Sequence, residues 1–162
     1  MSGENPITTS SQTVGPFFSF GVTTKLGQSA PASTARRTVL AVRVLDGEGA
    51  PLDDALVEYW HKTEGDATAR CGRAATNRMG ACTIDTVEPS GHINICLFAR
   101  GLLRHVYTRI YFPDSAANDR DAVLALVPSA RRQTLFAVPD GPAQWRFDIH
   151  LQGPHETVFF DQ

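Results

Sequence analysis

Hydrophobic and polar residues alternate with a period of two along most of this chain. Successive side chains of a β-strand point to opposite faces of the sheet, so this alternation predicts strands with one buried face. Clusters of Gly, Pro, Asn and Asp separate the alternating segments, and these residue types favour turns. The pattern predicts strands at residues 38–45, 55–61, 70–77, 81–87, 92–98, 105–112, 134–138 and 144–151.

Turn-forming residues indicate which of these strands are neighbours. Residues 46–49 have the sequence Asp-Gly-Glu-Gly, so we expect strands 38–45 and 55–61 to pair with each other. A turn at residues 77–80 separates two further strands, and a short link at residues 99–101 ends another. The chain is therefore expected to reverse direction after each short strand, as it does in antiparallel sheets.

The number and spacing of the strands indicate the fold class. They predict an all-β protein, a mainly antiparallel β-sandwich of about eight strands. One short helix is expected at residues 119–126, with Asn118 as its N-cap and Pro128 just beyond its end. The first part of the chain lacks this period, so we expect an extended N-terminal arm over residues 1–36 and a sandwich domain over residues 37–162.

Composition narrows the possible classes of protein. The 162 residues favour one domain, and 42% hydrophobic and 20% charged residues are ordinary for a globular protein. The formal net charge of −2 gives no general attraction to nucleic acid or to an anionic membrane surface. No apolar run approaches the ~20 residues of a membrane span, and the polar first residues predict no secretory signal. The three cysteines contain no Cys-x-x-Cys pair, so we expect free thiols in a cytoplasmic protein.

The predicted strand at residues 92–98 has the pattern of a metal-binding strand that lacks one ligand. His92 and Asn94 are two residues apart, so their side chains share a face. A His-x-His pair would place two imidazoles around one metal ion, whereas a neutral amide oxygen is a poor ligand for a transition metal. The strand therefore suggests a relative of a metalloenzyme that has lost its own metal.

Four segments, taken in order, carry a resemblance to a known family. They are SQTVGPFF at residues 11–18, VLDGEGAPLDDALVEYWH at 44–61, HINICLFARGLLRHVYTRIYF at 92–112, and WRFDIHLQGPHETVFFD at 145–161. Together they resemble the intradiol ring-cleaving dioxygenases and, among them, the alpha subunit of protocatechuate 3,4-dioxygenase. These enzymes use O2 to open a catechol ring between its two hydroxyl-bearing carbons.

The resemblance also indicates what this chain lacks. Catalytic members of the family hold one Fe(III) ion with two tyrosinates and two histidines on a β-sandwich. The tyrosinate positions fall in a part of this chain that has no tyrosine between Tyr59 and Tyr107, and Asn94 replaces the second histidine. Only His92 remains of the four ligands. The resemblance therefore implies that this chain binds no metal and no cofactor of its own.

The alpha subunits of the family are iron-free, and the resemblance assigns this chain the same part. It implies a non-catalytic subunit, inactive alone, that completes the substrate pocket of an Fe(III)-bearing beta partner. Thr13, Gly15, Pro16 and Phe17 would wall that pocket around an aromatic dihydroxy acid, and Arg100 would lie at the same interface. A guanidinium can pair bidentately with a carboxylate. The family commonly has Tyr at the position of Phe17, and its loops are longer after the positions of Gly65 and Pro89.

Two other functions stay open on the residues alone. One is a non-enzymatic binding or scaffold module, in which Arg100 is a solvated turn residue and the Phe17 and Phe18 rings pack on the chain's own sandwich. The other is a stand-alone metalloenzyme using His92, His105 and His150, because zinc accepts imidazole ligands in tetrahedral geometry. The metalloenzyme requires these three histidines to converge in the fold.

Overall fold

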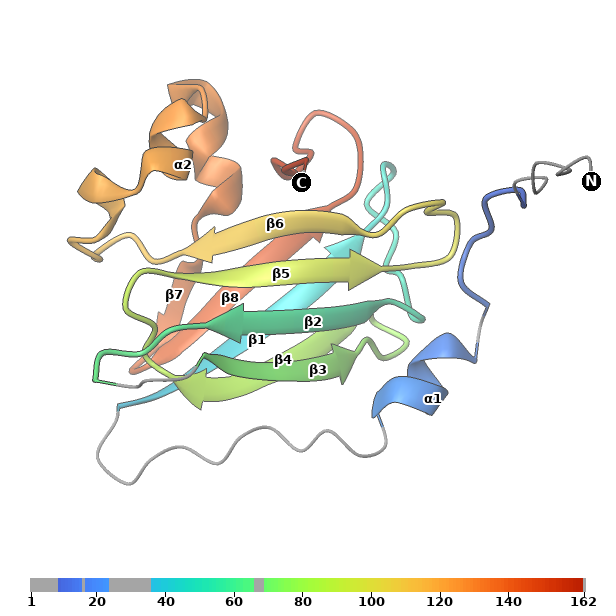
Figure 1. Ribbon diagram of the computed structural model, residues 1–162, viewed down its shortest axis with the longest axis horizontal. Helices are drawn as coiled ribbons and strands as arrows, with labels where there is room; N and C mark the ends of the chain where they lie inside the picture. The colour runs from blue at the N-terminus through green and yellow to red at the C-terminus, as the bar shows by residue number, and fades with distance from the viewer. Residues whose placement is uncertain (1–8, 16, 24–35, 66–68, 162) are drawn as a thin grey trace, which may run out of the picture.

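The computed structural model describes residues 9–15, 17–23, 36–65 and 69–161, and within them eight strands form two facing sheets (Figure 1). One sheet has the order β4-β1-β8-β7, and the other has the order β3-β2-β5-β6. Every strand pair is antiparallel except β1 with β8, which run parallel. This confirms the predicted all-β, mainly antiparallel sandwich. The strands are β1 (Arg37–Leu45), β2 (Leu56–His61), β3 (Arg70–Ala75), β4 (Ala81–Val87), β5 (His92–Phe98), β6 (Val106–Tyr111), β7 (Val138–Gly141) and β8 (Gln144–His150).

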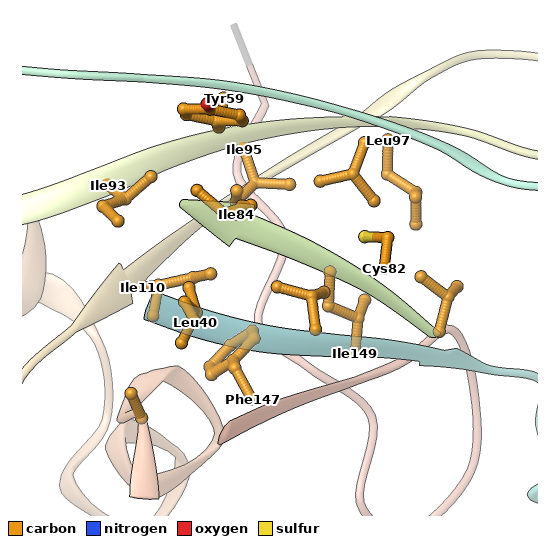
Figure 2. Close-up of a cluster of buried hydrophobic side chains, with 14 of the residues drawn as sticks. Leu40, Tyr59, Cys82, Ile84, Ile93, Ile95, Leu97, Ile110, Phe147 and Ile149 are labelled. Carbon is orange, nitrogen blue, oxygen red and sulfur yellow. The ribbon is translucent and has the colours of Figure 1, made fainter. Parts of the chain in front are cut away.

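The core lies between the two sheets, where alternate residues of each strand meet. Leu40 of β1, Ile84 of β4, Ile93 and Ile95 of β5 and Ile149 of β8 are fully buried there (Figure 2). Burying an aliphatic side chain of this size stabilises a fold by about 1.5–3 kcal/mol. The alternation of hydrophobic and polar residues with a period of two therefore arises because every second residue of a strand faces this core.

Tyr59 and Gly72 show how closely the second sheet packs. The two residues are register partners on β2 and β3, and a Cβ atom on Gly72 would lie 2.4 Å from the hydroxyl oxygen of Tyr59. Only glycine leaves room for the tyrosine side chain at this point. The pKa of Tyr59 is raised to about 12, chiefly because the side chain is buried, so the phenol keeps its proton.

The predicted pairing of strands 38–45 and 55–61 is wrong. β1 and β2 belong to different sheets, because β4 and β8 already occupy the two hydrogen-bonding edges of β1. The turn itself forms, with Asp46 Oδ1 accepting hydrogen bonds from the amides of Glu48 and Ala50. After a single bridge between Leu45 and Pro51 the chain crosses to the other sheet.

The region after β6 differs from the prediction in two details. The predicted helix at residues 119–126 is a 3-10 turn, η1 (Asn118–Arg120), followed by α2 (Ala122–Leu126). Asp121 caps α2, while the Asn118 side-chain amide donates a hydrogen bond to the Phe112 carbonyl. Asn118 Oδ1, the atom that would accept from helix amides, has no hydrogen-bond partner among the described residues, and Asp121 is the N-cap instead.

The strand predicted at residues 134–138 does not form as one element. Its first two residues end a second 3-10 helix, η2 (Ser129–Leu135), Phe136 makes an isolated bridge with Tyr111, and β7 begins only at Val138. The Thr134 hydroxyl donates a hydrogen bond to the Arg131 carbonyl and accepts one from the Val158 amide. Threonine side chains compete in this way with strand ladders for backbone groups. No helix in the described ranges is long and apolar enough to cross a membrane.

The N-terminal arm is expected to be extended, and its described part also contains a short helix, α1 (Phe18–Thr23). α1 lies against β3 at one end of the second sheet, and α2 lies near β6 at the opposite end (Figure 1). Pro16 and residues 1–8 and 24–35 of the arm lie outside the described residues. The division into an arm over 1–36 and a sandwich domain over 37–162 stays a prediction.

Candidate functional site

β5 presents its polar residues on the outer face of the sandwich. Ile93, Ile95 and Leu97 are fully buried in the core, so the alternate residues His92 and Asn94 point outward. The two side chains share a face, as the sequence predicts. The outer face of β5 therefore carries both candidate regions. Metal chemistry would lie at its His92 end, and contacts with a partner would lie at its Phe98 end.

His92 lies in a closed group of polar side chains, which we call the Asp121 cluster: His92, Arg109, Tyr111 and Asp121. His92 Nδ1 is 3.1 Å from Asp121 Oδ2, and Arg109 Nη1 is 3.4 Å from both carboxylate oxygens of Asp121. Arg109 also donates to the Tyr111 hydroxyl at 3.3 Å. Asp121 thereby links β5 and β6 to α2, because it also accepts hydrogen bonds from backbone amides of α2.

The backbone register places the cluster. His92 is opposite Tyr111 in the β5–β6 ladder, and Asn94 is opposite Arg109, so one polar row crosses both strands. Asp121 reaches this row because it is the N-cap of α2, accepting hydrogen bonds of 2.9 Å from the amides of Val123 and Leu124. The cap preference of aspartate explains its position at the helix start.

The environment sets the charge of each member of the cluster. Burial, together with the positive charge of Arg109, lowers the pKa of His92 against the opposing effect of Asp121. Burial alone would raise the pKa of Asp121, but the Leu124 and Val123 amides and the charges of His92 and Arg109 hold it below its usual value. Burial raises the pKa of Tyr111. At neutral pH the cluster is an Arg–Asp ion pair with a neutral imidazole and a neutral phenol.

These residues do not fit the Fe(III) centre of a catalytic family member. His92 Nδ1 faces Asp121, the Asn94 amide donates to the Trp60 carbonyl at 3.3 Å, and the guanidinium of Arg109 adds a positive charge beside them. The Tyr111 hydroxyl accepts a hydrogen bond from Arg109, so the same positive charge lies beside the phenol of the cluster. In the described part of the chain no three His, Cys, Asp or Glu side chains form a group that could hold a metal.

The three histidines of the metalloenzyme alternative lie far apart in the fold. His105 packs against Phe98 and Tyr107, with ring centroids 5.2 and 4.9 Å away, near the end of β5 remote from His92. His150 is on β8 in the other sheet. The convergence that a three-histidine zinc site requires is therefore not present in the structure.

The opposite end of β5 meets the N-terminal arm. The Thr13 hydroxyl accepts a hydrogen bond from the Gly101 amide at 2.9 Å and donates to the Ala99 carbonyl at 3.4 Å. One side chain of the arm therefore bonds the residues on both sides of Arg100. The structure thus brings together two of the residues that the sequence predicts for a shared site, although they are far apart in the chain.

The other predicted residues of the arm lie next to this contact. Gly15 accepts a backbone hydrogen bond from Phe18, whose ring is 5.4 Å from that of Phe98. The Phe17 ring is 78% exposed. Of the two rings, Phe18 packs on the chain's own sandwich and Phe17 faces outward. Pro16 lies outside the described residues.

Arg100 has two partners that the sequence did not indicate. Its Nε donates to Asp54 Oδ2, and its Nη2 is 3.7 Å from Asp53 Oδ1. The β2–β5 register pairs Leu56 with Phe98, so the next outward positions along both chains bring Asp54 beside Arg100. Knowing that β2 and β5 pair would have revealed this contact, but the sequence does not specify that pairing.

Solved structures show the class to which this fold belongs. The dioxygenase domain of a dioxygenase–carbohydrate-binding protein fusion from Streptomyces sp. SirexAA-E matches with a TM-score of 0.60 and 25% identity. The match covers 75% of this chain and 84% of that domain. No family model matches the chain. The intradiol ring-cleavage dioxygenase of Tetranychus urticae is 15% identical and has the same fold, with a TM-score of 0.61 over 80% of this chain and 86% of that chain.

Curated relatives identify the family within that class. The protocatechuate 3,4-dioxygenase alpha chain of Burkholderia cepacia is 36% identical over 190 positions, covering 94% of this chain and 96% of the relative. The alpha chain of Pseudomonas putida is 34% identical, with the same coverage. This chain belongs to the family of protocatechuate 3,4-dioxygenase alpha chains. The 190 aligned positions exceed the 162 residues of this chain, so the relative has insertions that this chain lacks.

Proposed function

We propose that this chain is the iron-free alpha subunit of a protocatechuate 3,4-dioxygenase-type enzyme, and that it completes the substrate pocket of an Fe(III)-bearing beta partner. The observation that carries the proposal is the hydrogen bonding of Thr13 to Ala99 and Gly101, which joins the arm to the Arg100 corner. Both elements then face a partner together. By itself the chain is inactive, because the His92 end of β5 offers no set of iron ligands.

The exposed groups at this corner match the chemistry of an aromatic dihydroxy acid. The Arg100 side chain is 55% exposed and offers a guanidinium to the substrate carboxylate, while the exposed Phe17 ring offers an apolar face to the aromatic ring. Thr13 holds the arm at this position, and we assign Gly15 and Pro16 to the same wall. The partner's Fe(III) supplies the reaction of the catechol with O2, and this chain supplies orientation and binding.

We assign the enzyme to the cytoplasm. The thiols of Cys71, Cys82 and Cys96 are all free, as is usual in a reducing compartment. Cys82 is buried in the core, and burial raises the pKa of its thiol to about 12, which makes it a space-filling group rather than a nucleophile.

The test is Arg100→Ala in the enzyme assembled with its beta chain, with protocatechuate and unsubstituted catechol as substrates. Losing a charge-assisted contact removes about 1.5–3 kcal/mol of binding, so KM for protocatechuate should rise by about 10-fold or more. KM for catechol should change little. Arg104→Ala removes the same charge from an exposed position in the same loop and serves as the matched control.

Equal changes in KM for the two substrates would exclude a role of Arg100 toward the carboxylate. Failure of the chain to assemble with a beta chain at all would favour the binding or scaffold module instead.

A further inference from the structure

Arg100 lies between two adjacent carboxylates that differ sharply in burial. The Asp54 side chain is 11% exposed and the Asp53 side chain is 54% exposed. Both belong to the turn that precedes β2, and both reach the same guanidinium, Asp54 at Nε and Asp53 at Nη2. Adjacent residues of the same type therefore hold one cation in two different ways.

Asp54 is the fixed partner. Its Oδ2 accepts a hydrogen bond from Arg100 Nε, while its Oδ1 is buried and has no hydrogen-bond partner among the described residues. A carboxylate withdrawn from water in this way needs a cation close by. The bond at Nε fixes the plane of the guanidinium and leaves its terminal nitrogens for another acceptor.

Asp53 is the exchangeable partner. Its Oδ1 lies 3.7 Å from Arg100 Nη2, which is within ion-pair distance and beyond hydrogen-bond distance. Both side chains of this pair are more than half exposed, so water screens their attraction. A carboxylate that offers short hydrogen bonds to the terminal nitrogens of Arg100 can therefore displace Asp53 without disturbing Asp54.

We propose that Asp54 is a positioning residue for Arg100 and that Asp53 competes with the carboxylate of the incoming substrate for the same guanidinium. This inference rests on the proposed function, since it assumes that Arg100 receives a carboxylate from the substrate. It predicts that the two aspartates have opposite effects on affinity. Removing Asp54 loosens the guanidinium and weakens binding, whereas removing Asp53 frees it and strengthens binding.

The experiment compares Asp53→Asn with Asp54→Asn in the assembled enzyme, with protocatechuate and catechol as substrates. The two variants make the same chemical change one residue apart, so each is the matched control of the other. KM for protocatechuate should rise by about 3- to 10-fold in Asp54→Asn. It should fall by about 2- to 5-fold in Asp53→Asn, the range expected for an exposed ion pair. KM for catechol and kcat for both substrates should stay within about 2-fold.

Three outcomes separate this inference from the proposed function. A change of KM in the same direction for both variants, or no change in either while Arg100→Ala raises KM, overturns the inference. No effect of Arg100→Ala on the choice between the two substrates overturns the proposed function itself. If Asp54→Asn does not fold, Asp53→Asn still decides: a KM for protocatechuate that is unchanged or raised in this variant overturns the inference.

Discussion

The two ends of β5 carry opposite kinds of chemistry on the same outer face. At the His92 end, Asp121 joins an imidazole, a guanidinium and two helix amides, so that each polar group bonds to another within the chain. At the other end, Arg100 is half-exposed and the arm is bonded around it through Thr13. At one end the polar groups pair within the chain, and at the other about half of the Arg100 side chain is exposed.

Under the proposed function, the difference explains how a chain with a metalloenzyme fold can work in the enzyme without a metal of its own. Polar groups left without a metal in a partly buried position would be unstable unless they found other partners. Here the carboxylate of Asp121 and the charge of Arg109 supply those partners. At the Arg100 corner the same constraint applies to the buried carboxylate of Asp54, and Arg100 supplies its partner. Water solvates the exposed part of the Arg100 side chain.

The largest expected effect comes from Asp121→Ala, which disrupts the His92 end. The substitution removes the cap of α2 and leaves His92 and Arg109 without their shared acceptor, so we expect the free energy of unfolding to fall by about 2–4 kcal/mol. Urea denaturation followed by circular dichroism measures it. Asp119→Ala, an exposed aspartate in the adjacent 3-10 turn, is the control and should change stability by less than about 0.5 kcal/mol. Equal effects would show that Asp121 does not organise the cluster.

A smaller effect follows from the lowered pKa of His92. Since its pKa lies below the unfolded value of about 6.5, the unfolded chain binds more protons and stability declines as the pH falls below about 6.5. His92→Asn should remove this part of the pH dependence between pH 7.5 and 5, measured by urea denaturation at several pH values. His155→Asn, the same change at an exposed histidine, is the control. An unchanged slope in His92→Asn would contradict the arrangement of the His92 end.

The smallest expected effect on stability belongs to the Arg100 end. Thr13→Val keeps the shape of the side chain and removes its two hydrogen bonds, so we expect a loss of about 0.5–1.5 kcal/mol. Thr83→Val, at an exposed position of β4, is the control with no expected loss. Thermal unfolding of the chain alone and the dissociation constant for the beta chain should both change in Thr13→Val. No change in either would show that the arm is not held at the Arg100 corner.

Much of the fold could be predicted from local pattern. The alternation of residues such as Ile93, Asn94 and Ile95 specifies a strand and its buried face, because that choice depends only on neighbours in sequence. The sheet to which a strand belongs depends on distant partners. β1 and β2 are therefore separated, despite the turn between them, because β4 and β8 occupy both edges of β1.

The candidate site divides in the same way. From the sequence, and from its resemblance to the family, came the predictions that Asn94 stands in place of an imidazole and that Thr13, Phe17 and Arg100 belong to a shared site, since residue type and order suffice for that comparison. Only the tertiary structure decided that Asp121 binds His92 and that Asp54 holds Arg100. These pairings depend on strand register and helix placement, which many long-range contacts decide together and which no local pattern of residues encodes.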